Sequence, residues 1–378
     1  MPPLSARLPD PLPWRELARP LARAEDALAR LDERLRTSPI RDGWIARTHF
    51  SDAAAALWLE GELVHLEDLL LHDAGMDIRA PTHELTRAHA ILRARRRIAG
   101  AAPGWALSPA GLEALRGGRA GESDATEDRA ESAEPGDDGD DEGPAFEPPL
   151  AEDDEFAELF ASVDAAVLRA DRTLAGERRP PAPPNGERDP LVYDLDRDEH
   201  ARLAEWRGIV DQTRDLPPTL AAAISVEAWT AFEPLQRAPG LERLLAAALL
   251  ADRGKARAHL PCLAEGAKAV PRERRRSRDA ATRVAAELEA IAAAAEEGLK
   301  QHDRWALART LLLRKLDGCR STSRLPELIE YVISRPLVSA GMIAKELAIT
   351  PRTAQSLVAE LGLREATGRM RYRAWGIL

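Results

Sequence analysis

Aromatic side chains, cysteines and long apolar runs are all scarce in this chain of 378 residues. Aromatic residues make up 4% of it, so its cores must be built mainly from Ala, Leu and Val. Stretches rich in Ala, Leu, Arg and Glu favour helices over strands. Because no run of 18 apolar residues occurs, we expect no membrane-spanning segment.

The two cysteines, Cys262 and Cys319, show no spacing with histidines that resembles a zinc site. His259 and Cys262 form a single pair without further partners, and we interpret them as part of a packed turn. The first 14 residues contain five prolines and no apolar core segment, unlike a secretory signal. We therefore expect a cytoplasmic bacterial protein with reduced thiols, no metal and no cofactor.

The net charge of −10 is unfavourable for binding nucleic acid, but it is unevenly distributed. Residues 122–158 contain 17 acidic residues and one arginine, which leaves +6 for the rest of the chain. Such acidic runs usually keep a chain soluble, and a partner-binding or DNA-mimicking role is the alternative. Partners must therefore be predicted region by region.

Changes in composition divide the chain into six segments, and the predicted fold is mostly α. The segments are an N-terminal helical region (1–116), an acidic disordered linker (117–152), a helix (153–175), a Pro-rich linker (176–190), a central helical domain (191–320) and a C-terminal winged helix-turn-helix (323–378). The linkers contain too little apolar surface to offset the entropy of ordering them.

Helices upstream of the C-terminal segment are predicted from apolar residues at three- and four-residue spacing. They cover residues 17–35, 52–71, 83–97, 153–174, 241–249, 284–295 and 305–316. The first should begin near Pro20, because proline is tolerated only in a first turn, and Thr82 is the expected N-cap of the third. No strand is expected before the wing.

The C-terminal segment carries the signals of a helix-turn-helix. Helices are predicted over 325–333, 340–347 and 351–361; Pro336 ends the first and Thr350 caps the third. Two short helices, a tight turn and a third helix with a polar face form the geometry that places a recognition helix in the major groove of DNA.

The third helix and the wing supply the expected DNA-binding residues. On the helix and its cap they are Thr350, Arg352, Thr353, Gln355 and Ser356. Arg and Gln near the N-terminal end suit base edges, whereas Thr and Ser suit bases or phosphates. On the wing, Arg369, Arg371 and Arg373 alternate and should share a face toward the phosphates. A module that mediates only protein contacts is the alternative.

A second dense group of cations is a candidate phosphate-contacting patch. It consists of Arg272, Arg274, Arg275, Arg276 and Arg278. A solvated helix start explains the same pattern equally well.

Two stretches resemble Fic-family proteins. Residues 363–371, L-R-E-A-T-G-R-M-R, look like the winged helix that closes many of them. Glu60 and Gly61 match the Ser/Thr-x-x-x-Glu-Gly/Asn pattern of the Fic inhibitory helix, although Ala56 stands at the Ser/Thr position. The resemblance implies a degenerate Fic-like fold.

The Fic catalytic motif, H-P-F-x-x-G-N-G-R, is missing. Aligned without a gap, Phe232 replaces its histidine, the general base that the family uses for AMP transfer. Ala238 replaces its asparagine, and Gln236 stands where a magnesium-anchoring acid would be. The resemblance therefore implies loss of the transferase chemistry.

More of the chain resembles a family of alphaproteobacterial proteins, often rhizobial and plasmid-borne, that pair a domain of unknown function with a C-terminal helix-turn-helix. The similar stretches are residues 58–98, residues 241–276 with A-H-L-P-C at 258–262, and the C-terminus. The resemblance covers most of the chain outside residues 117–149, and it implies DNA binding without an established reaction.

We therefore predict a transcriptional regulator that binds double-stranded DNA in a sequence-specific manner and is not an enzyme. The upstream helices would bind an effector, a protein partner or a second copy in a homodimer. The alternatives are a divergent Fic-type nucleotidyl transferase and a protein-interaction adaptor.

Overall fold

The structure, a computed structural model, describes residues 12–76, 80–116, 198–236, 238, 240–316, 323–366 and 373–376. Within these residues it is mostly helical, as predicted. The expected linkers, the helix over 153–174, Cys319, Arg369 and Arg371 lie outside the described residues. No helix in the described part is both long and apolar enough to cross a membrane.

The described residues from 12 to 316 are called the helical body. Its elements are α1 (Trp14–Arg36), α2 (Arg41–Glu60), α3 (Leu66–Asp73), α4 (His83–Gly100), the 3-10 helix η1 (Trp105–Leu107), α5 (Pro109–Arg116), α8 (Glu199–Gln212), α9 (Pro218–Phe232), α10 (Leu241–Asp252), α11 (Leu263–Lys268), α12 (Arg272–Arg275) and α13 (Ala280–Arg314).

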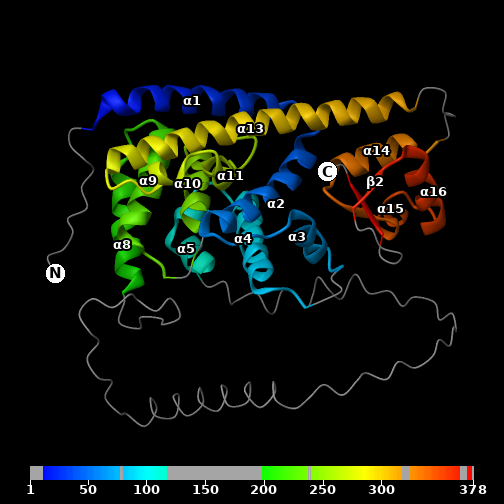
Figure 1. Cartoon of the computed structure of the whole chain (residues 1–378), viewed down its shortest axis with the longest axis horizontal. Helices are drawn as coiled ribbons and strands as arrows, with labels where there is room; N and C mark the ends of the chain where they lie inside the picture. The colour runs from blue at the N-terminus through cyan, green and yellow to red at the C-terminus, as the bar shows by residue number, and fades with distance from the viewer. Residues whose placement is uncertain are drawn as a thin grey trace, which may run out of the picture. The chain divides into compact units, whose positions relative to one another are not determined.

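The long helix α13 organises the helical body. It lies beside α1 (Figure 1) and also packs against α9 and α11. One apolar core joins residues from both sides of the undescribed stretch, including Leu28 of α1, Leu244 of α10 and Leu288 of α13. Alanines fill much of this core, as the scarcity of aromatic residues requires, and their small side chains let the helices approach closely.

The structure corrects the first two predicted helices. The first begins at Trp14, so Pro20 lies inside α1 rather than in its first turn. The burial of Leu17 against the core stabilises the helical turn that precedes Pro20. The helix predicted over 52–71 is wrong. Gly61 adopts a left-handed conformation (φ 92°) and ends α2, so Leu63 is 69% exposed instead of buried.

The two helices predicted over 284–295 and 305–316 form one helix, α13. Gly298, which lies between them, does not break it. A Cβ at Gly298 would lie 2.8 Å from Leu31 and 3.0 Å from Trp44. The absence of a side chain there lets α13 pack tightly, and this packing outweighs the low helix propensity of glycine. The predicted N-cap of α4 is confirmed, since the side chain of Thr82 accepts a hydrogen bond from Leu85 N.

The described residues from 323 to 376 are called the C-terminal module. Its elements are α14 (Leu325–Ser334), β1 (Val338–Ser339), α15 (Ala340–Glu346), α16 (Pro351–Leu361), β2 (Arg364–Glu365) and β3 (Ala374–Gly376). The strands form an antiparallel sheet in the order β1-β3-β2, with Val338 opposite Trp375 and Glu365 also opposite Trp375. The short strand β1, before α15, was not expected from the sequence.

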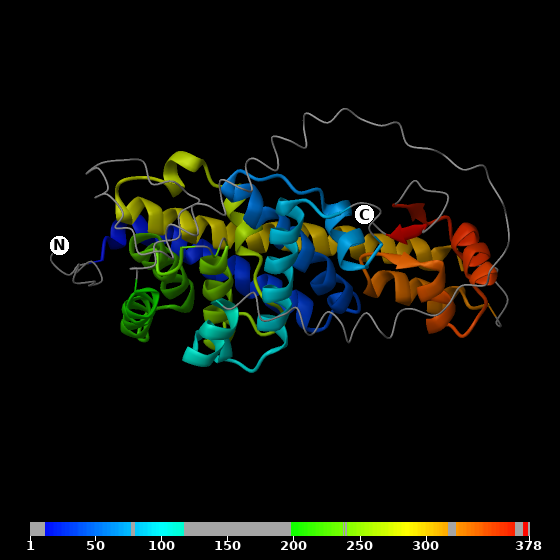
Figure 2. The same cartoon turned by 90° about the horizontal axis from the view of Figure 1, so that it is seen from below.

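The last turns of α13 pack against α14 (Figure 2), so the module does not have a separate core. Leu312 of α13 and Ile40, which directly precedes α2, are buried in the same cluster as Leu328, Val332 and other residues of α14. The helical body therefore completes the core of the C-terminal module.

Candidate nucleic-acid interface

Local capping signals fix both ends of α16. The side chain of Thr350 accepts a hydrogen bond from Thr353 N at 3.2 Å, and Pro351 follows as the first helical residue. Gly362 ends the helix in a left-handed conformation (φ 65°). Between α15 and α16, Ala348 also has a positive φ of 50°. This tight turn sets the angle between the two helices.

One face of α16 is buried and the other is exposed. Ala354, Val358 and Leu361 pack into the core of the module. The predicted residues that the structure leaves exposed together on the other face are Thr350, Arg352, Thr353, Gln355 and Ser356. Within the described residues, neither Arg352 nor Gln355 has a side-chain hydrogen bond or ion pair. Both side chains are therefore available to an external partner.

The threonines on this face are less available. The hydroxyls of Thr350 and Thr353 lie 2.8 Å apart and share a hydrogen bond, and Thr350 also caps the helix. Their first role is to hold the N-terminus of α16, so Arg352 and Gln355 are the main candidates for base contacts.

Of the three predicted wing arginines, Arg373 is the one that lies among the described residues, and it has partners. Its Nε donates to Glu365 Oε2 at 2.8 Å, and its guanidinium lies 5.4 Å from the centre of the Trp375 ring. The hydrogen bond and the charge of Glu365 raise the pKa of Arg373. Glu365 therefore compensates part of the charge that was expected to face phosphates.

The second basic patch is divided between bound and exposed arginines. Arg274 pairs with Glu289, and Arg275 donates to Val270 O at 3.0 Å. The other members, Arg272, Arg276 and Arg278, are exposed. The patch lies just before the first residue of α13, whereas α14 packs against the last turns of α13. The 35 residues of α13 span about 50 Å, which separates the patch from α14. The patch is therefore not part of the α16 surface, and its role stays a prediction.

His259 and Cys262 lie in a tightly packed turn. The buried side chain of Arg95 pairs with Asp52 at 2.7 Å and donates to Leu260 O at 2.6 Å and Pro261 O at 3.1 Å. Burial raises the pKa of the Cys262 thiol to about 12 and lowers the pKa of His259. A thiol that stays protonated at neutral pH is a poor nucleophile.

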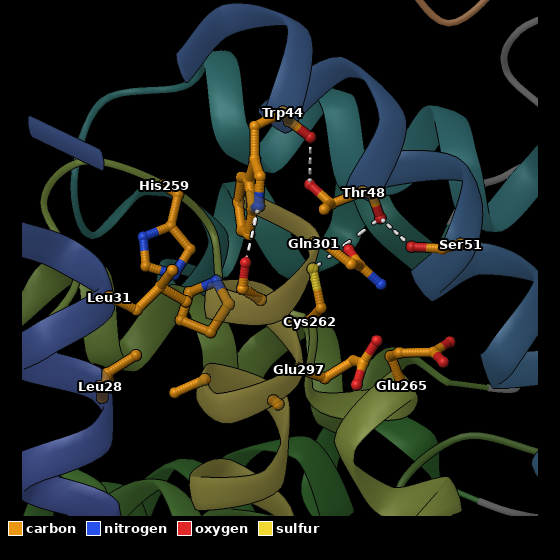
Figure 3. Close-up of a pocket in the computed structure, with 14 residues that line it drawn as sticks. Leu28, Leu31, Trp44, Thr48, Ser51, His259, Cys262, Glu265, Glu297 and Gln301 are labelled. Atoms are coloured by element: carbon orange, nitrogen blue, oxygen red, sulfur yellow. Dashed lines mark hydrogen bonds between the residues drawn. The ribbon is translucent and has the colours of Figure 1, made fainter. Parts of the chain in front are cut away.

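A small hollow beside this turn is lined by Trp44, Thr48, His259 and Cys262 among others (Figure 3). The space enclosed is about 10 Å³, which is room for about one water molecule. A nucleotide would not fit in this hollow.

The structure brings the segment aligned with the Fic catalytic motif into contact with the stretch aligned with the Fic inhibitory helix. A Cβ on Gly240, just before α10, would lie 2.9 Å from the Cβ of Ala56 in α2. The charge of Glu60 in α2 also acts on the guanidinium of Arg243 in α10. Burial acts to lower the pKa of Arg243, but the charges of Glu287, Glu242 and Glu60 together raise this pKa. The position of the missing histidine is filled by the buried side chain of Phe232, which has no group that accepts a proton.

Sequence reasoning did not find the cations that hold the helix ends of the module. Arg324 donates to Leu347 O at the end of α15. From the helical body, Arg47 donates to carbonyls at the end of α14, and Lys315 to Leu361 O at the end of α16. One feature of the sequence could have pointed to Arg47: it is the one cation within the stretch from Trp44 to Thr48.

Comparison with known proteins agrees with this geometry. Residues 325–378 match a family model described as "HTH DNA binding domain", and residues 191–317 match one described as "Protein of unknown function (DUF1612)". A protein of Sinorhizobium fredii (strain NBRC 101917 / NGR234), named "Uncharacterized protein y4cF", is 48% identical over 369 residues, covering 96% of this chain and 97% of that protein. The predicted rhizobial resemblance is confirmed, whereas the Fic-like resemblance stays a prediction.

Proposed function

This chain belongs to the family of the Sinorhizobium fredii protein and carries a helix-turn-helix DNA-binding domain after its DUF1612 region, and we propose that it is a transcriptional regulator that binds double-stranded DNA in a sequence-specific manner. It acts in the cytoplasm. The helical body serves to bind an effector, a protein partner or a second copy.

The exposed face of α16 carries this proposal. Arg352 and Gln355 lie in its first turns, where side chains of a recognition helix reach base edges in the major groove. Neither side chain is used inside the described part of the protein. A module that served only protein contacts would not require hydrogen-bond donors without partners at these two positions. Arg side chains bind guanine edges and Gln side chains bind adenine edges.

The sheet supports a winged form of the helix-turn-helix. Strands β2 and β3 are antiparallel neighbours, and β3 also pairs with β1. The chain between β2 and β3 contains Arg369 and Arg371. We propose that these two arginines contact phosphates beside the groove that α16 enters, and that Arg373 contributes less because it pairs with Glu365.

The test begins with a duplex selected from random sequence by the full-length protein. Replacing Arg352 or Gln355 with Ala should weaken binding to that duplex by roughly 1–3 kcal/mol and relax the sequence preference. Replacing Arg369 or Arg371 with Ala should weaken binding to all sequences alike and reduce the salt slope by about one. Arg373→Ala should have a smaller effect.

Arg30→Ala is the matched control, because Arg30 is an exposed arginine of α1 and its loss removes the same charge. If all the variants in the module bind duplex as the wild type does, the module is better explained as a protein-contact domain.

We also propose that the protein is not an enzyme of the Fic type. The support is the side chain of Phe232, which replaces the general base of that family and is buried at the end of α9. AMP transfer without a base at this position would need a different catalytic residue.

A further inference from the structure

The helical body contacts the C-terminal module at the C-terminal ends of two helices. Arg47 of α2 donates to Val332 O at 3.0 Å, to Ile333 O at 2.6 Å and to Arg335 O at 2.6 Å. Lys315, directly after α13, donates from Nζ to Leu361 O at 2.6 Å. One cation therefore holds the end of α14, and the other holds the end of the recognition helix α16.

Helix ends favour such partners. The last carbonyls of a helix have no donor within the helix, and the C-terminus carries partial negative charge. Arg47 is 8% exposed and forms no ion pair with a carboxylate of the described residues. Its guanidinium also lies 5.4 Å from the ring centre of Trp305 in α13. The side chain is thus buried against backbone carbonyls, three of them in the module and one, Gly43 O at 3.0 Å, in its own helix.

These contacts leave the proposed DNA face open. Arg352, Gln355 and Ser356 are exposed while α14 and the end of α16 are held. The helical body therefore does not cover α16. Instead, it fixes the direction in which the axis of α16 points relative to the rest of the chain.

We propose that Arg47 and Lys315 are positioning residues for the DNA interface, through which the helical body presents α16 to DNA in one orientation. This inference rests on the proposed function and adds to it that sequence preference depends on residues that do not touch DNA. Base contacts need side chains placed within a fraction of an ångström, so a recognition helix that tilts loses discrimination before it loses affinity for phosphates.

The first measurement needs no DNA. Spin labels at Arg30→Cys in α1 and Glu360→Cys in α16, both exposed sites, report the distance between body and module in a full-length chain with Cys319→Ser. Cys262 is buried and keeps its proton, so it should not react. Pulsed electron paramagnetic resonance should give one narrow distance for the wild type and broader distributions for Arg47→Met and Lys315→Met.

The second measurement is the ratio of affinities for the selected duplex and a scrambled duplex. Arg47→Met and Lys315→Met should lower this ratio by roughly 2- to 30-fold, the usual range for residues that couple two regions without touching the ligand. Arg314→Met is the matched control, because Arg314 is the exposed neighbour of Lys315 and its replacement removes the same charge. Lys315→Arg, which keeps a donor, should restore the ratio.

An unchanged ratio in both methionine variants overturns the proposal, even if the distance distributions broaden. If Arg47→Met does not fold, as judged by circular dichroism, Lys315→Met alone decides, since that side chain lies at the surface. Failure of the proposed function has a different signature: the wild type itself shows no preference among duplexes, or Arg352→Ala leaves the preference intact.

Discussion

Replacing Gly43 with alanine tests whether α2 and α14 meet as closely as the structure shows. A Cβ at Gly43 would lie 1.8 Å from the carbonyl oxygen of Ile333, and 2.9 Å from Nη1 of Arg47. Real contacts of a Cβ essentially never fall below 3.0 Å. The end of α14 must therefore retreat by about 1.2 Å to accommodate the methyl group.

The retreat lengthens the bonds from Arg47 to Ile333 O and Arg335 O, which are both 2.6 Å, beyond hydrogen-bond range. Hydrogen bonds to a charged group contribute at least about 1.5 kcal/mol each. Alanine offsets about 1 kcal/mol of this loss, because it has the higher helix propensity. Gly43→Ala should therefore lower the free energy of unfolding by about 2 kcal/mol.

Urea unfolding of the full-length chain measures this change, and amide hydrogen exchange shows whether α14 loses protection. Gly208→Ala is the matched control. Gly208 lies within α8, and a Cβ there would meet no atom within 4 Å. The control should therefore gain up to about 1 kcal/mol. If Gly43→Ala is stabilised to the same extent as Gly208→Ala, α14 does not dock against α2 and the reasoning fails.

Three further outcomes are expected. Burial, together with the charges of Arg95 and Arg96, lowers the pKa of His49 to about 3. Between pH 6.5 and 3 only the unfolded state gains this proton, so stability falls with decreasing pH by up to about 1.4 kcal/mol per pH unit. His49→Gln should show a shallower decline in urea unfolding between pH 7 and 5, and equal slopes would contradict this assignment. Residues 117–149 carry a net charge of −10; their deletion should strengthen duplex binding at low salt and leave the thermal midpoint nearly unchanged, and a fall of several degrees would argue against a solvated linker. Incubation with labelled ATP and magnesium should leave no label on the denatured protein, because Phe232 cannot accept a proton, and a covalent label would restore the transferase hypothesis.

The ends of the module's helices were predictable because their signals are local. Thr350 followed by Pro351 specifies the start of α16 through the hydroxyl cap and the fixed φ of proline. The predicted range 351–361 is confirmed, and Pro336 lies two residues beyond the end of α14. Neither signal depends on distant parts of the chain.

Helix bounds in the helical body depended on packing, and packing was not visible in the sequence. Gly298 and Gly61 are both glycines within helical patterns. Gly298 stays helical because Trp44 and Leu31 pack closely against it. Gly61 has no atom within 4 Å of its Cβ position, and the helix ends there. Local propensity is the same in both cases, so only tertiary contacts separate them.

The candidate site was predictable in part for the same reason. The exposed face of α16 follows from helical periodicity, so Arg352 and Gln355 were found from the sequence. The contacts of Arg47 and Lys315 join residues 285 and 46 positions apart in the chain. Helical periodicity says nothing about pairs at such separations.

The length of α13 has a mechanical consequence. A single helix of 35 residues runs from the DUF1612 core to the residues that hold α14 and α16. Over about 50 Å, a tilt of about 3° of the whole helix would displace one end relative to the other by about 2.6 Å, about three quarters of the 3.4 Å between adjacent base pairs along one strand. A ligand that shifts the core by a few degrees would therefore move the recognition helix by most of a base-pair step, without any change within the module.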